Sequence, residues 1–419
     1  MRFIHTADIH LDSPLTGLSA YQDAPAALLR TATRDAFDNL VGEALAEQVD
    51  FMVIAGDLYD GSWKDFNTGI YFAAQMGRLQ AAGIPVYLLL GNHDADSEMT
   101  RKLVLPDNVH RFPSNKAGSF LLPELRVALH GRSFKEAATT ENLAVHYPDP
   151  VPGWFNIGVL HTALEGNAAH ASYAPCSLAE LQARGYQYWA LGHVHEHKVW
   201  REAGCTIAYP GNLQGRHIRE SGPRGALLVS TQGQEIDTLQ RLPVDVLRWH
   251  TLRVDVTACQ QLDEVVRAVG QALQDLLADA QDERPLALRV LLHGASPAHG
   301  QLFGLELQLR AEVQAQAAAL GRDRLWIEKL RLETTAHDNP AAVADRADAL
   351  ADLQALLVQA EADPVFLQGL QDDLMALVGK LPLEVLAAVP ELAQVRAGQL
   401  QGLVQATAPA LLAQLAKAD

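Results

Sequence analysis

The stretch His5-Thr6-Ala7-Asp8-Ile9-His10 decides the fold of the first half of this 419-residue chain. The short run from Phe3 to Ala7 predicts a buried strand, and an aspartate and a histidine follow it two positions apart. Side chains with this spacing at a strand end can project to the same side. We therefore interpret the stretch as a strand that delivers two polar groups to the edge of a sheet.

The same pattern recurs along residues 1–232, where short apolar runs alternate with helical spacing, as in a layered α/β domain. Further strands are predicted over 51–55, 85–90, 155–160 and 188–191, and helices over 26–48 and 65–82. Functional groups of α/β sheets gather at the carboxyl ends of strands, so we expect the turns after these strands to share one edge. The polar residues delivered there are Asp8, His10, Asp57, Asn92, His93, Asp94, His161, His193 and His195.

The pattern changes near residue 240, and we predict three parts, over residues 1–240, 241–339 and 340–419. In the second part, strands over 249–256, 286–292 and 325–333 and helices over 262–280 and 304–321 predict a small α+β domain. The third part holds four basic and ten acidic residues, which fits protein docking better than DNA binding. Its prolines, at 364, 382, 390 and 409, predict a series of short helices.

Composition restricts the class of function. The net charge of −17 argues against tight DNA binding without metal, because neutralising phosphates normally takes basic patches. DNA remains open as a substrate, because two divalent ions would bring about four positive charges to the site. No apolar run approaches the ~20 residues of a membrane-spanning helix. The N-terminus lacks the apolar stretch of a signal peptide, and the three cysteines match no disulfide or zinc pattern, so we expect a cytoplasmic protein.

The strand-end residues predict a site for two divalent ions. Asp57 follows a glycine, which allows a close turn, and its two carboxylate oxygens can bridge two ions. Oxygen and nitrogen ligands without a thiolate favour Mn²⁺, Mg²⁺, Fe or Zn²⁺, of which we expect Mn²⁺. A bridging hydroxide would then attack phosphorus in line. The two expected ligand sets are Asp8, His10, Asp57 and His195 for one ion, and Asp57, Asn92, His161 and His193 for the other.

His93 is the candidate proton donor to a leaving alkoxide, and we expect Asp94 to hold its imidazole in orientation. The same Gly-Asn-His-Asp sequence also suits a plain turn. His161, alone after its strand, also suits a structural role when taken by itself. The ordered set of five strand ends favours the metal site in both cases.

Two further features have a functional and a structural interpretation of equal weight. Asp60 either belongs to the site, where it supports the ligands from outside or lies beside the substrate, or caps the following segment. A basic cluster near the metal motifs either contacts substrate phosphates or forms a solvated loop held by acids such as Glu220. Its members are Arg216, His217, Arg219 and Arg224.

This ordered set resembles the calcineurin-like metallophosphoesterase superfamily and, within it, the SbcD/YhaO group of bacterial DNA-repair exonucleases. The specific cues are His5-Thr6-Ala7-Asp8-Ile9-His10-Leu11-Asp12-Ser13-Pro14, Gly56-Asp57-Leu58-Tyr59-Asp60, Tyr209-Pro210-Gly211-Asn212 and Gly215-Arg216-His217-Ile218-Arg219-Glu220. The resemblance covers residues 1–230 through these motifs and the remainder through its layout.

The resemblance implies a layered metallophosphoesterase β-sandwich flanked by helices, in which His93 protonates the leaving 3′ oxygen. It implies that the second part caps the site and helps to select DNA ends. It also implies that the helical tail docks on an SMC-like coiled-coil ATPase, and it is compatible with a homodimer.

Two enzyme classes and a non-enzymatic class fit these residues to different degrees. Our first hypothesis is a DNA exonuclease or endonuclease that works with an ATPase. The alternative is a phosphodiesterase of small substrates such as nucleotides, which would use the same ligands. A protein phosphatase is disfavoured, because Leu58-Tyr59-Asp60-Gly61 stands in place of the Asp-Arg-Gly triplet of that class.

A non-enzymatic scaffold is disfavoured because every expected ligand is present. The absence of a phosphate-binding loop argues against ATP hydrolysis by this chain.

Overall fold

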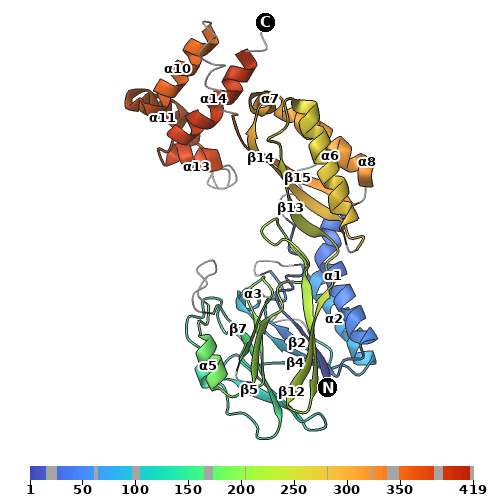
Figure 1. The fold of residues 1–419 in the computed structure, drawn as a ribbon. Coiled ribbons are helices and arrows are strands. Elements are labelled where there is room, and N and C mark those ends of the chain that lie inside the picture. Colours follow the sequence, from blue (N-terminus) through green and yellow to red (C-terminus); the bar gives the residue numbers. More distant parts are fainter. Residues whose placement is uncertain are drawn as a thin grey trace. The chain divides into compact units, whose positions relative to one another are not determined.

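The computed structural model describes residues 1–15, 26–60, 65–96, 104–164, 173–202, 204–280, 282–321, 324–336, 349–381 and 390–415. Contacts divide the chain into two compact units (Figure 1). The first comprises Met1–His250 and Arg284–Ala287, and the second comprises Thr251–Glu283 and Leu288–Asp419. All the predicted ligands belong to the first unit.

Two six-stranded sheets form the first unit. The first sheet has the order β12-β11-β1-β2-β3-β4, and the second has the order β5-β6-β7-β8-β10-β9. The strands of the first are β1 (Arg2–Thr6), β2 (Phe51–Ala55), β3 (Val86–Leu89), β4 (Val109–Arg111), β11 (Gly225–Gln232) and β12 (Glu235–Pro243). Those of the second are β5 (Gly118–Leu122), β6 (Val127–Gly131), β7 (Phe155–His161), β8 (Tyr188–Gly192), β9 (Lys198–Glu202) and β10 (Cys205–Tyr209).

The two sheets pack face to face through a shared apolar core. Phe3 stacks on Phe51 with ring centroids 5.0 Å apart, and Tyr188 of the second sheet meets Phe3 edge-on at 5.5 Å. The central strands of both sheets run parallel and are buried on both faces, which explains their nearly continuous apolar sequences. Parallel pairing also places the carboxyl ends of neighbouring strands at one edge.

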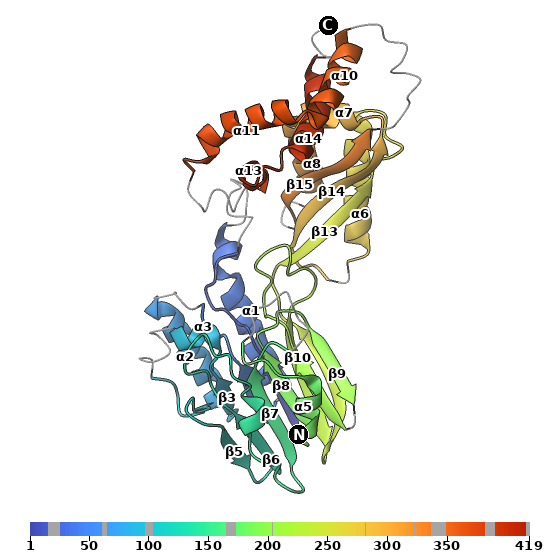
Figure 2. The same cartoon turned by 90° about the vertical axis from the view of Figure 1, so that its left-hand side faces the viewer.

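Helices cover the outer faces of the sandwich (Figures 1 and 2). The helices α1 (Ala26–Ala46) and α2 (Phe66–Ala81) cover the first sheet in a second apolar cluster, and α5 (Leu178–Ala183) covers the second sheet. Asp65 begins α2 by accepting a hydrogen bond from the Asn67 N–H at 2.9 Å. The predicted α/β class and layered architecture are confirmed.

The second unit is built on a three-stranded sheet with the order β13-β14-β15. Its described elements are β13 (Arg248–Asp255), α6 (Leu262–Ala278), β14 (Leu286–Ser296), α7 (His299–Gly304), α8 (Glu306–Gly321), β15 (Leu325–Ala336), α10 (Ala349–Ala362), α11 (Pro364–Val378), α13 (Pro390–Arg396) and α14 (Gln401–Leu415). The strands and helices predicted for residues 249–333 are present, with α7 as an addition. None of the helices in the described part of the chain is both long and apolar enough to cross a membrane.

The tail prolines act differently from one another. Helices begin at Pro364 and Pro390, as predicted, but α14 runs through position 409, so the prediction of a helix break there was wrong. A proline removes one backbone hydrogen bond from a helix, and that loss does not always end it. Pro382 and the predicted boundary at residue 340 lie outside the described residues, and the division into three domains stays a prediction.

We expect Gly158→Ala to lower the free energy of unfolding by about 1–3 kcal/mol, because it overpacks the core. A Cβ atom at position 158 would lie 2.3 Å from Cε3 of Trp189, which is fully buried. Urea unfolding of the full chain would measure the change.

Gly77→Ala is the matched control, because no atom lies within 4 Å of the Cβ that it adds on α2. Alanine is the better helix former by about 0.5–1 kcal/mol, so this variant should be slightly stabilised. A Gly158→Ala variant as stable as Gly77→Ala would contradict the packing that we describe.

Candidate metal centre

Turns that follow strands bring the predicted polar residues to one edge of the sandwich. Asp8 and His10 follow β1, Asp57 follows β2, and α3 (Asn92–Asp96) follows β3. The Nε2 atoms of His10 and His195 lie 3.2 Å apart, although 185 positions separate the two residues in the chain. The fold therefore brings together nitrogen atoms from its first and its fifth ligand segment.

His161 connects two further candidates. Its Nε2 lies 2.9 Å from Asn92 Oδ1 and 3.4 Å from Asp57 Oδ2. Its Nδ1 lies 2.9 Å from the carbonyl oxygen of Ala55, which can only accept a hydrogen bond. This contact fixes the ring so that Nε2 points at the carboxylate and the amide oxygen.

Among the described residues, three groups of acidic and histidine side chains each bring ligand atoms within 4.8 Å of one another. The groups are Asp8 with His10 and His195, Asp8 with Asp57 and His161, and His10 with Asp60 and His93. The first two groups share Asp8, whereas the two predicted ligand sets share Asp57, so the division of ligands between two ions stays a prediction. His193 is not in these groups, but its N–H donates to both Asp8 oxygens at 3.0 Å and its ring meets that of His161 at 5.3 Å.

Four of the predicted ligands hold a left-handed backbone conformation. The φ angle is 50° at Asp8, 45° at His10, 53° at Asp57 and 100° at His193. Such conformations cost about 1–3 kcal/mol each and persist only where the surrounding structure holds them. Here the Asp8 N–H donates to the Gly56 carbonyl at 3.0 Å, and the His10 N–H donates to the Asp57 carbonyl at 3.1 Å. Backbone strain gathered on the ligand turns is typical of a functional site.

Two glycines allow these turns to approach one another. A Cβ atom at Gly91 would lie 2.3 Å from Asp57 Oδ1, and one at Gly56 would lie 2.3 Å from His161 Nδ1. Any larger residue at either position would displace a candidate ligand. The glycines before Asp57 and Asn92 are therefore required by the close contact of side chains as well as by the turn.

Burial and mutual contact set the protonation of these groups. Burial would raise the pKa of Asp57, but His161 beside it lowers that pKa well below its usual range. Burial would lower the pKa of His161, but Asp57 raises it to about 9. Burial raises the pKa of Asp8 to about 6, and burial and Arg216 lower that of His10. The protein thus holds a buried carboxylate that needs positive charge close to it.

Backbone amides of the ligand turns hold the Asp94 carboxylate. Its Oδ2 accepts hydrogen bonds from the N–H groups of Leu58 at 3.2 Å and Gly91 at 3.0 Å, and its Oδ1 accepts one from Tyr59 at 3.0 Å. The three amides belong to two ligand turns, and the carboxylate that accepts their hydrogen bonds is buried. Asp94 therefore braces the turns, and its role in orienting His93 stays a prediction.

Asp60 is the acid that contacts the His93 imidazole. Its Oδ1 lies 3.2 Å from His93 Nδ1, and its Oδ2 accepts a hydrogen bond from Ser13 Oγ at 2.8 Å. This contact with Asp60 raises the pKa of His93. Arg216 Nη1 donates to Ser13 Oγ at 3.1 Å and lies 4.0 Å from Asp60. Asp60 and Arg216 therefore lie on the His93 side of the site.

The rest of the basic cluster is divided between surface and interior. Arg219 is exposed, and His217 lies 3.6 Å from Glu220. Arg224 is buried, and its guanidinium donates to the Ser221 carbonyl at 2.8 Å and to Glu196 Oε1 at 3.1 Å. For Arg224 the structural interpretation is the better one.

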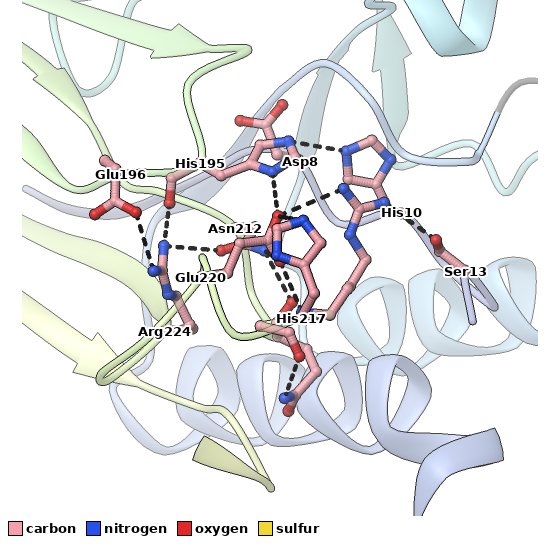
Figure 3. Close-up of polar contacts among 12 residues, drawn as sticks. Asp8, His10, Ser13, His195, Glu196, Asn212, His217, Glu220 and Arg224 are labelled. Atoms are coloured by element: carbon pink, nitrogen blue, oxygen red, sulfur yellow. Dashed lines mark hydrogen bonds and ion pairs between the residues drawn. The ribbon is translucent and has the colours of Figure 1, made fainter. Parts of the chain in front are cut away.

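Glu220 is a site residue that sequence reasoning gave only a role in the loop (Figure 3). Its Oε1 lies 2.7 Å from His195 Nδ1, and its Oε2 accepts hydrogen bonds from Asn212 Nδ2 at 3.0 Å and from the Arg216 N–H at 2.7 Å. The carboxylate thus directs His195 Nε2 toward His10. A histidine that binds metal commonly has a carboxylate at its other nitrogen, which is the one signal that could have indicated such a partner.

Comparison with known proteins assigns the family. The family model of calcineurin-like phosphoesterases matches residues 1–197, and that of the middle domain of metallophosphoesterase YhaO matches residues 249–335. The chain is 34% identical over 300 residues to the uncharacterized metallophosphoesterase YhaO of Bacillus subtilis, which covers 71% of this chain and 72% of that protein. The chain belongs to the calcineurin-like phosphoesterase family.

Two more distant similarities accompany this one. The chain is 24% identical over 273 residues to the DNA double-strand break repair protein Mre11 of Sulfurisphaera tokodaii, covering 62% of this chain and 67% of that protein. The crystal structure of TT1561 of Thermus thermophilus aligns over 58% of this chain and 98% of its own, with 14% identity and a TM-score of 0.36. The family assignment does not depend on either.

Calcineurin-like phosphoesterases use a dinuclear metal site, and the donors of this chain fit one. Two imidazole nitrogens that face each other at 3.2 Å and a buried carboxylate within 4.0 Å of one of them form a set that a cation would satisfy. The Nδ1 of His10 is buried and has no hydrogen-bond partner in the described structure. The cysteines lie outside all three ligand groups, so the donors are oxygen and nitrogen, as predicted.

We expect Glu220→Gln to weaken Mn²⁺ binding by about 10–100-fold, because His195 loses the carboxylate that orients it. Isothermal titration of the metal-free full chain with Mn²⁺ would measure the affinity. Glu196→Gln is the matched control, because the Glu196 side chain is 54% exposed and pairs with Arg224 instead. Equal Mn²⁺ affinities for the two variants would contradict a role of Glu220 in metal binding.

Proposed function

We propose that this chain is a two-metal-dependent phosphodiesterase that cleaves DNA, with His93 as the proton donor. The observation that carries the proposal is the placement of Asp57. Its Oδ2 lies 3.4 Å from His161 Nε2 and 4.0 Å from His10 Nε2, between histidines of the two predicted ligand sets. A carboxylate in that position is suited to bridge two ions.

Each ion would be held by residues from several turns. Bound together, two divalent ions would supply positive charge to the phosphate oxygens and activate a solvent molecule as the nucleophile. The ligands are proposed as predicted, with Asp8, His10, Asp57 and His195 for one ion and Asp57, Asn92, His161 and His193 for the other. We propose Mn²⁺ for both positions, with Mg²⁺, Fe and Zn²⁺ as the other ions that such donors accept.

The chain's own acid is placed for leaving-group protonation. The His93 side chain is 40% exposed, whereas that of His161 is fully buried. Asp60 favours the protonated imidazole, the form that can donate. A protonated imidazole at the exposed side of a metal site can donate its proton to a poor leaving group such as a sugar oxygen.

DNA is supported as the substrate by the kinship with proteins named for DNA double-strand break repair. The predicted roles of residues 241–339 in capping the site and selecting DNA ends, and of residues 340–419 in docking a coiled-coil ATPase, are part of this proposal, as is a homodimer. The second candidate is a phosphodiesterase of small substrates, which the same ligands would serve.

The test uses purified full-length chain, Mn²⁺ or EDTA, and DNA duplexes labelled at either end. Metal-dependent cleavage of the DNA supports the proposal. If bis-p-nitrophenyl phosphate is hydrolysed and DNA is not, even with a co-purified ATPase partner, the small-substrate alternative replaces it. If neither is hydrolysed and no metal binds, the phosphodiesterase proposal fails.

We expect His93→Ala to lower kcat on DNA by about 10²–10⁴-fold, as the loss of a general acid does. The loss on bis-p-nitrophenyl phosphate should be much smaller, because nitrophenolate leaves without being protonated. Mn²⁺ titration would check that the metal ligands are intact. An equal loss on both substrates would contradict the role as proton donor.

Asp60→Asn should lower kcat on DNA less than His93→Ala, because it acts through the imidazole that it contacts. In the double variant Asp60→Asn should therefore add little to the loss caused by His93→Ala, since residues that act as a unit are not additive. Single-turnover rates of the four proteins would show this. Additive losses would mean that Asp60 has a separate role.

A further inference from the structure

A cavity of about 610 Å³ opens beside the candidate metal centre. Asp94 and Ala95 of the ligand turn α3 line it, so the cavity begins where the site ends. Phe134 forms another part of its wall, and the ring of Phe134 meets that of His161 edge-on at 5.6 Å. The cavity and the metal centre are therefore neighbours at this edge of the sandwich, with Phe134 in contact with both.

Among the described residues that line the cavity, the charged ones are two basic residues and one acid whose oxygens accept backbone hydrogen bonds. Arg111 and Lys135 line the cavity with exposed side chains. The acid among its lining residues is Asp94, which is buried and accepts three backbone hydrogen bonds. In a chain with a net charge of −17, two cations beside the metal centre form a local exception.

A second cavity, of about 300 Å³, shares part of its lining with the first and has a different charge. The two share Lys135, but Glu136 and Glu141 also line the second. Arg132 of the second cavity is paired with Glu141 at 2.8 Å. The described lining of the second cavity therefore carries less net positive charge than that of the first.

We propose that the first cavity binds the nucleotide next to the scissile phosphodiester, with Arg111 and Lys135 on its phosphate. This inference rests on the proposed function and names a subsite for its substrate. The volume lies in the range of small-molecule sites, about 300–1,000 Å³, and is sufficient for one nucleotide. Arginine and lysine are the usual partners of backbone phosphates, and Asn115 adds an amide to the same lining. The acids of the second cavity restrict the strong contact to this one nucleotide.

The test is a binding measurement, so that it does not depend on DNA cleavage. Thymidine 3′,5′-bisphosphate has one phosphate for the metal centre and one for the cavity, whereas the 3′- and 5′-monophosphates have only one. All three are titrated calorimetrically into the Mn²⁺-loaded full chain, in the His93→Ala background to prevent turnover. We expect the bisphosphate to bind at least 10-fold more tightly than either monophosphate.

Charge reversal identifies the residues. Arg111→Glu with Lys135→Glu should abolish the preference for the bisphosphate and leave the affinities for Mn²⁺ and the monophosphates within about twofold. Arg126→Glu with Arg201→Glu is the control, because both side chains are exposed and lie outside both cavities. These substitutions change the net charge equally and should keep the preference.

Three results would overturn the subsite: no preference for the bisphosphate, a preference that survives in the Arg111/Lys135 variant, or an equal loss in the control. A length series adds a further requirement. A dinucleotide phosphorylated at both ends carries a third phosphate and should bind no more than about twofold more tightly than the bisphosphate. A steady gain with length would contradict the restriction to one nucleotide. A preserved preference in a protein that cleaves no DNA would refute the proposed function and leave the subsite standing.

Discussion

The shared contact of Asp57 with two histidines is the constraint on which the rest of the site depends. Its side chain is 3% exposed, and its oxygens are within 3.4 Å of His161, 4.0 Å of His10 and 3.1 Å of the His93 N–H. An ionised carboxylate is stable at that depth only next to positive charge. The fold places histidines that follow strands of both sheets beside this carboxylate. For the same reason the site is suited to bind cations.

The sandwich provides the rigidity that the strained turns need. The strands before Asp8, Asp57 and His193 are buried along their whole described length or nearly so, and the aromatic contact of Phe3 and Phe51 ties two of them together. Left-handed φ angles at ligands persist because the strands fix the turn ends and the turns hydrogen-bond to each other. The stable core therefore holds the ligands in a fixed geometry, and metal binding does not have to order them.

The sequence was sufficient to predict the strands that carry ligands, because buried parallel strands leave a continuous apolar pattern followed by polar residues. It did not predict the strands β4 to β6 and β9 to β12, none of which is followed by a predicted ligand. The partners of the ligands were harder still. Asp60 and Asp94 are both acids near His93, and only the backbone amides that surround Asp94 decide between them. Glu220 lies 25 positions from His195, and that contact depends on tertiary folding alone.

The charged side chains around the candidate site act mainly on groups close to them. A chain with a net charge of −17 repels nucleic acid at long range, so the proposed function requires groups that recognise DNA within a few ångströms. Buried acids such as Asp94 and Glu220 are saturated with hydrogen bonds from their neighbours and present little free charge to a ligand. Arg111 and Lys135 are exposed, and Debye screening limits their reach to about 8 Å at physiological salt. An enzyme of this design would have little affinity for the length of a DNA duplex and would engage a substrate where a phosphodiester reaches the metal centre.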